Sequence, residues 1–174
     1  MFSKLFRRSQ KRKPAPEPKA IYKELRGLIF TMSPDEVGII RSQDTPNVWG
    51  VVMETGYPEG AATLVSLADG TTSLYLEGGG GLIGGGSHKI VAEATKALVL
   101  DAEKYYEGMT QTTSFPPPAI DNVRFFILTF SGVYTIEAPE DDLGEERHHL
   151  SPFFFKCQDV ITSIRESGLI GSQT

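Results

Sequence analysis

Apolar residues recur along this chain with two different periods, and each period predicts one kind of element. Spacings of three and four residues predict three helices, at 21–30, 87–108 and 151–164. Runs rich in branched and aromatic residues predict five strands, at 48–54, 62–68, 71–77, 123–130 and 133–137. The elements therefore follow one another in the order α-β-β-β-α-β-β-α.

Turn and cap residues punctuate these elements. Asp69-Gly70 and Ser131-Gly132 predict two hairpin turns. Three serines precede helical patterns and are predicted N-caps: Ser33, Ser87 and Ser151. Ser33 also begins a capping box with Glu36, which predicts an additional short helix. The remaining connections are predicted loops, at 56–60, 110–118 and 139–150.

Two hairpins separated by a helix favour a mainly antiparallel sheet over a doubly wound one. We therefore expect an α+β fold with a five-stranded sheet and packed helices. The expected organisation is a basic, proline-rich tail at 1–18, one domain at 19–168 and a short C-terminal tail at 169–174.

Glycine occupies seven of the nine positions in 78–86, between a predicted strand and a predicted helix. Such density indicates positive φ angles or close backbone approach. Backbone N–H groups at the helix start could also bind a phosphate or carboxylate, and a histidine and a lysine could add charge. The candidate ligand-binding residues are Gly80, Gly81, Gly84, Gly85, Gly86, Ser87, His88 and Lys89. Partner contact and a purely structural connection are the alternatives.

Two specific nucleotide motifs are excluded at this loop. Residues 79–84 match G-x-G-x-x-G, but a dinucleotide site also needs a βαβ unit with an acid after the second strand. Asp101 has the right spacing but falls within the same predicted helix. No Gly-Lys-Ser/Thr follows the glycines, so a P-loop is excluded as well.

The net charge of −5 conceals a strong asymmetry between the tail and the body. Residues 14–174 carry 11 Lys and Arg against 22 Asp and Glu, which argues against a broad nucleic-acid surface. The tail is basic, and its apolar residues share one face if it is helical, a pattern typical of weak binding to anionic membranes or polymers. A disordered soluble tail is the alternative. The candidate contact residues are Phe2, Lys4, Leu5, Phe6, Arg7, Arg8, Lys11, Arg12 and Lys13.

The remaining reactive side chains have ordinary structural interpretations. An acidic run ending in His148 and His149 contains metal-ligand types, but its spacing matches no metal motif, and a solvated loop is favoured. The single cysteine, Cys157, lies on the apolar stripe of the last helix and is expected to be buried. Trp49 is expected in the core or on a partner surface. No apolar run is long enough to cross a membrane.

The element order resembles that of the small dimeric chaperones of type III secretion, which bind partners and lack catalytic residues. Roadblock/longin-type scaffolds are similar in having a strand, a glycine-containing loop and a helix. They divide their strands two and three around the middle helix, whereas this chain divides them three and two. The segments 49–55 and 74–80 resemble those of an uncharacterised bacterial family.

No set of nucleophile, base and orienting group is recognisable in the sequence. We therefore expect a non-enzymatic cytoplasmic binding, scaffold or chaperone-like protein that forms a homodimer and uses neither a cofactor nor a metal. Its tail would allow peripheral contact with the inner face of a membrane, and nucleic acid is not an expected partner. The alternative is a small-anion or nucleotide-binding protein that uses the loop at 78–86.

Overall fold

Seven strands form one antiparallel sheet in the computed structural model, which describes residues 15–169. The strands lie in the order β4-β3-β2-β1-β6-β7-β5. Their bounds are β1 Val48–Tyr57, β2 Gly60–Leu67, β3 Thr72–Leu76, β4 Gly81–Leu82, β5 Thr110–Thr112, β6 Asn122–Thr129 and β7 Gly132–Pro139. The α+β class is confirmed, but the expected count of five strands is wrong. Two short edge strands, β4 and β5, extend the five that were predicted.

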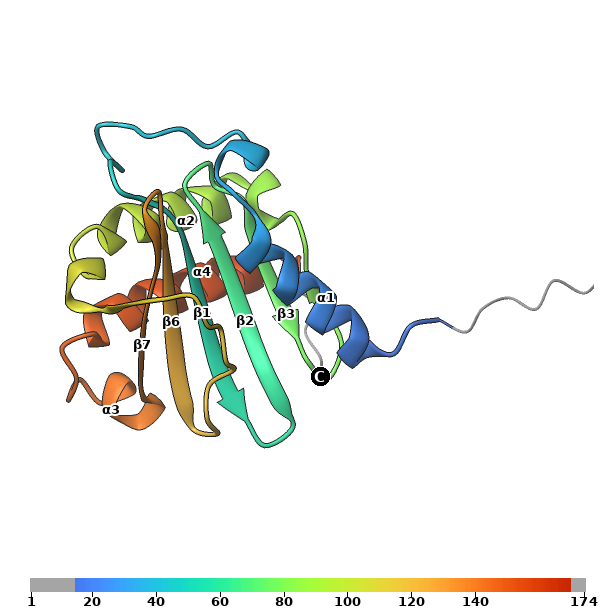
Figure 1. The fold of residues 1–174 in the computed structure, drawn as a ribbon. Helices are drawn as coiled ribbons and strands as arrows, with labels where there is room; N and C mark the ends of the chain where they lie inside the picture. The colour runs from blue at the N-terminus through green and yellow to red at the C-terminus, as the bar shows by residue number, and fades with distance from the viewer. Residues whose placement is uncertain (1–14, 170–174) are drawn as a thin grey trace, which may run out of the picture.

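Helices cover both faces of this sheet, as Figure 1 shows. The first helix, α1, packs on one face, while α2 and α4 pack against each other and against the opposite face. The helices are α1 Pro18–Thr31, α2 Lys89–Ala102, α3 Glu140–Gly144 and α4 Ser151–Glu166. Single 3-10 turns form at η1 Asp35–Val37, η2 Gly85–Ser87 and η3 Tyr106–Gly108.

Three hairpins and one long-range pairing join the five longer strands of the sheet. The predicted turns at Asp69-Gly70 and Ser131-Gly132 lie where expected, between β2 and β3 and between β6 and β7. The predicted loop at 56–60 is wrong, because β1 and β2 pair as far as Tyr57 and Gly60 and form a third tight hairpin. The pairing of β1 with β6 then joins the two halves of the chain, with Val52 opposite Phe126.

The short edge strands fall in segments that lack a strand pattern in the sequence. Gly81 and Leu82 of β4 pair with β3 inside the glycine loop. Thr110–Thr112 of β5 pairs with β7 inside the polar loop at 110–118. Both strands are too short for alternation to show, and the long neighbouring strand supplies their hydrogen-bond partners.

The starts of the two later long helices differ from the prediction by one residue. Ser87 belongs to η2, and His88 is the N-cap of α2. Ser151 is the first residue of α4, and Leu150 precedes it as the N-cap. No side chain caps either helix, so both predicted serine caps are wrong. The 3-10 bond from the His88 N–H to the Gly85 carbonyl shifts the start of α2 by one residue.

The capping box at Ser33 is confirmed by two reciprocal hydrogen bonds. The backbone N–H of Ser33 donates to a Glu36 carboxylate oxygen at 2.7 Å, and the N–H of Glu36 donates to the Ser33 hydroxyl at 3.4 Å. The box is followed only by the single turn η1, because Gly38 takes a φ of 71° and ends it. The predicted loop at 139–150 instead begins with the five-residue helix α3.

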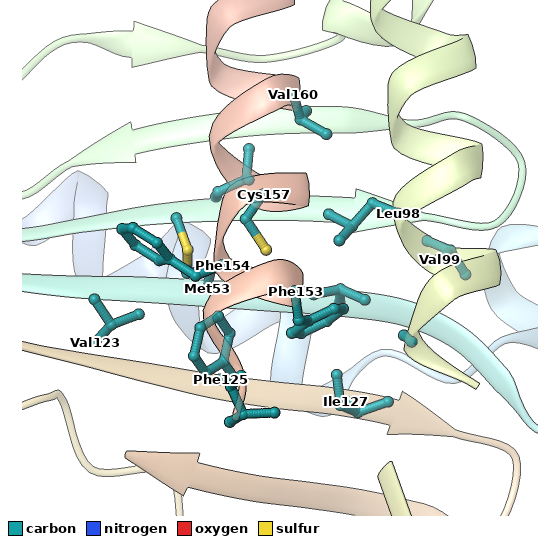
Figure 2. Close-up of a cluster of buried hydrophobic side chains, with 14 of the residues drawn as sticks. Met53, Leu98, Val99, Val123, Phe125, Ile127, Phe153, Phe154, Cys157 and Val160 are labelled. Atoms are coloured by element: carbon teal, nitrogen blue, oxygen red, sulfur yellow. The ribbon is translucent and has the colours of Figure 1, made fainter. Parts of the chain in front are cut away.

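Two apolar clusters occupy the two faces of the sheet. The larger lies between the sheet and the pair α2–α4, where Phe125, Phe153 and Cys157 are fully buried (Figure 2). The smaller lies under α1 and includes Trp49, whose indole N–H donates to the Thr129 carbonyl at 3.1 Å. Because β1 is buried on both faces, its sequence has no polar side chain from Val48 to Met53 instead of alternating.

Candidate functional site

Close backbone packing accounts for several glycines of the loop at 78–86. A Cβ on Gly81 would lie 2.1 Å from the Leu74 carbonyl oxygen, and one on Gly86 would lie 2.2 Å from that of Gly70. Gly85 is buried, and Gly80 and Gly84 have φ angles of 86° and 77°. The loop thus crosses from the sheet edge to the helix layer along a path that side chains would obstruct.

The other candidate residues of this loop lie exposed at the start of α2. Ser87, His88 and Lys89 are all exposed, and the Lys89 ammonium lies 3.7 Å from the Glu93 carboxylate. Gly81 and Gly86 therefore have a packing role, while ligand binding at this exposed turn stays a prediction. The variants His88→Ala and Lys89→Ala test it without disturbing the tightly packed backbone.

The acidic segment ending in two histidines forms α3 and a turn before α4. Arg147 pairs with Asp142 at 2.8 Å and also with Glu145. The ring nitrogen Nδ1 of His148 accepts the Leu150 N–H at 3.1 Å. Burial and the neighbouring His149 lower the pKa of His148. Among residues 15–169, no three His, Cys, Asp or Glu side chains converge as a metal-binding group.

The thiol of Cys157 is fully buried on α4, as the sequence predicted. Figure 2 shows its side chain between that of Met53 on β1 and that of Leu98 on α2. Burial raises the pKa of this thiol far above its ordinary value, with smaller contributions from Asp101 and Asp159. Because a nucleophilic cysteine needs an exposed thiolate, this residue has a packing role.

A buried ion pair, which the sequence did not reveal, attaches α1 to the sheet. The guanidinium of Arg26 donates from Nε and Nη2 to the two carboxylate oxygens of Glu54, at 2.6 and 2.8 Å. Glu54 is 0% exposed and also accepts the Thr63 hydroxyl at 2.9 Å. Tyr22 of α1 bonds the same hydroxyl at 2.7 Å. The one available signal was an acid that directly follows the run from Val48 to Met53, which has no polar side chain.

Two other carboxylates are engaged in holding the structure together. Glu103 accepts the backbone N–H groups of Asn47 and Val48, at 2.8 and 2.7 Å, just where β1 begins. Glu137 accepts hydrogen bonds from Asn122, the Ala119 N–H and Arg124. Burial alone would raise the pKa of Glu137, but these bonds outweigh it and the pKa is lowered.

A groove beside α4 offers a different kind of surface, which we call the α4 groove. Its volume is about 160 Å³. Met53, Leu64 and Leu74 form its floor and are neighbours in register across β1, β2 and β3. All three are almost fully buried, so the floor is a continuation of the main core.

The next row of the same three strands forms the outer part of the groove. Thr55, Ala62 and Leu76 lie side by side there, and Tyr57 lies beyond them on β1. Tyr57 and Leu76 are 44% and 40% exposed, although both are large side chains with apolar surface. The groove therefore leads from solvent over an apolar rim to the core.

The last turns of α4 form the opposite wall, through Gln158, Ile161 and Arg165. Their spacing of three and four residues places them on one side of the helix. Burial and the negative charge of Glu140 raise the pKa of Tyr57, while the nearby guanidinium of Arg165 acts in the opposite direction. Within residues 15–169, none of the ion pairs involves Arg165.

The nine tail residues predicted to contact membranes or polyanions, from Phe2 to Lys13, lie outside the described residues 15–169. In the described part of the chain, no helix combines the length and apolar content that crossing a bilayer requires.

Comparisons with protein-family models, curated proteins and solved structures find no match to this chain. The resemblances to secretion chaperones and roadblock/longin scaffolds accordingly stay predictions.

Proposed function

We propose that this chain is a non-enzymatic binding protein of the scaffold or chaperone kind, which holds its partner in the α4 groove. The observation that carries the proposal is the apolar rim of Tyr57 and Leu76, 44% and 40% exposed, directly above the buried floor. Covering such a surface removes apolar area from water, which is the main driving force of protein association.

The positions of the reactive side chains support the same proposal. Glu54 and Glu137 are bound by arginines and other donors, and the Cys157 thiol is enclosed in the core. These contacts maintain the fold, so we assign these three groups a structural role.

Two further parts of the proposal concern assembly and location. The resemblance in element order to dimeric chaperones motivates a homodimer. The basic residues of 1–13 motivate peripheral contact with an anionic membrane face from the cytoplasm, with roughly 1 kcal/mol from each Lys or Arg near the surface.

Site-specific photo-crosslinking in the cells that make the protein tests the binding role. A photoreactive amino acid at Leu76 should form adducts, while the same group at Leu28 should form few. Leu28 is a matched control, since it is 53% exposed but lies on α1, on the other face of the sheet. Adducts of two copies would identify the homodimer, and heterologous adducts another partner. Equal adducts from both positions, or none from Leu76, would refute the proposed site.

A further inference from the structure

The chemistry of the α4 groove specifies what kind of partner it fits, given the proposed function. We propose that the groove binds a peptide segment of a partner protein that inserts one aromatic or branched apolar side chain and places a carboxylate against Arg165. The proposal rests on three features of the groove: its size, the arrangement of its polar groups and the guanidinium of Arg165.

The size of the groove selects a single side chain. Pockets for whole small-molecule ligands usually measure roughly 300–1,000 Å³. The groove has about 160 Å³, close to the size of an engineered cavity of roughly 150 Å³ that binds benzene. One ring or branched aliphatic group fills it, and the rest of the ligand must lie outside. A peptide main chain that passes over the mouth meets this requirement.

The floor and walls set the polarity of the inserted group. Met53, Leu64 and Leu74 offer only apolar atoms to whatever enters, so a charged group at this depth would lose its hydration without compensation. Among the lining residues, the polar side chains lie on the outer row, at Thr55 and Tyr57, and on α4, at Gln158 and Arg165. They can bond the peptide groups on either side of the anchor.

The wall formed by α4 sets the preferred charge beside the anchor. Arg165 is exposed, lines the groove and has no ion-pair partner in residues 15–169. A guanidinium presents a planar fork that matches a carboxylate in two parallel hydrogen bonds. Glu140 contributes negative charge near Tyr57, so the attractive position for the partner's acid is on the α4 side.

A selection from a displayed library of random heptapeptides, on the full chain, tests the proposal. We expect enriched peptides to combine one aromatic or branched aliphatic residue with Asp or Glu nearby. Binding of a selected synthetic peptide should weaken roughly tenfold in Arg165→Gln, the loss of one charge-assisted contact. It should be unchanged in Lys156→Gln, an exposed cation of α4 that does not line the groove.

Two further variants test the anchor. Ala62→Leu fills the groove from its outer row and should abolish binding. Leu76→Glu places a negative charge at the exposed rim, which repels the acid of the peptide and should also abolish binding. It replaces Ala62→Leu if that variant does not fold. Circular dichroism and thermal unfolding will show whether each variant is folded. Peptides that bind both variants as well as the natural chain would overturn the proposal, as would enriched peptides that lack an acid and ignore Arg165.

The outcomes separate this inference from the function on which it rests. In one outcome, Leu76 crosslinks to a partner while the selection enriches no peptide that combines an apolar anchor with an acid. That result would refute the inferred peptide ligand and leave the proposed binding role intact. The absence of crosslinks from Leu76 and of enriched peptides would overturn both. Enrichment that depends on Arg165 and Ala62 supports both.

Discussion

The buried ion pair between Arg26 and Glu54 gives the sharpest prediction about stability. The change Arg26→Met removes two of the three donors that the structure gives the Glu54 carboxylate, and leaves only the Thr63 hydroxyl. The carboxylate cannot recover hydration, because Glu54 is 0% exposed. Stranding one member of a buried pair costs about 3–5 kcal/mol.

A loss of this size is large against a total stability of roughly 5–15 kcal/mol. In a chain of this length each kcal/mol shifts the melting temperature by roughly 2–4 °C, so Arg26→Met should lower it by about 6–20 °C. Urea unfolding followed by the fluorescence of Trp49 gives the free energy directly, since this is the one tryptophan and it is buried.

Two companion variants isolate the cause. Adding Glu54→Leu to Arg26→Met removes the stranded charge and should recover about 2 kcal/mol or more, since apolar replacement of a whole buried pair is often neutral. Arg41→Met is the matched control. Arg26 lies 5.1 Å from the centroid of the Phe30 ring, and Arg41 likewise lies 4.6 Å from that of Phe130. Within residues 15–169 Arg41 bonds only the Pro46 carbonyl, so its loss should cost less than about 1 kcal/mol. A loss below about 1 kcal/mol in Arg26→Met, or no recovery in the double variant, would refute the reasoning.

Three further predictions concern packing, thiol chemistry and pH. Gly86→Ala should lose about 1–3 kcal/mol in urea unfolding because its Cβ meets a carbonyl oxygen at 2.2 Å, whereas Gly78→Ala, with no atom within 4 Å, should be neutral or gain up to about 1 kcal/mol. The Cys157 thiol should react with a colorimetric disulfide reagent only at the rate of unfolding, and fast labelling of the native chain would contradict its burial. The pKa of His148 is lowered in the folded chain, so as the pH drops this imidazole takes up its proton in the unfolded chain before it does in the folded one. The free energy of unfolding should therefore fall as the pH drops below about 6.5. His148→Asn, which keeps an acceptor for the Leu150 N–H, should remove that component, and an unchanged pH profile would exclude His148 as its source.

Local sequence was sufficient to predict the α+β class and most of the elements. Periodicity located the five long strands, and Asp69-Gly70 and Ser131-Gly132 located two hairpins, because these signals depend on neighbouring residues alone. The capping box at Ser33 and the burial of Cys157 were predicted for the same reason. The predicted site at the glycine loop rested on local pattern too, and the pattern could not distinguish close packing from ligand binding.

Pairings across long stretches of chain decided the rest. The strands β4 and β5 exist because β3 and β7 offer them free edges, and no pattern within two or three residues can show this. The pairing of β1 with β6 sets the strand order, and the docking of α1 turns Glu54 from an apparent interruption into the acceptor for Arg26. The α4 groove is tertiary in the same sense. It forms where three strands meet the last turns of α4. The strand residues of its rim and floor are therefore far from Arg165 in the sequence, and only the fold brings them together.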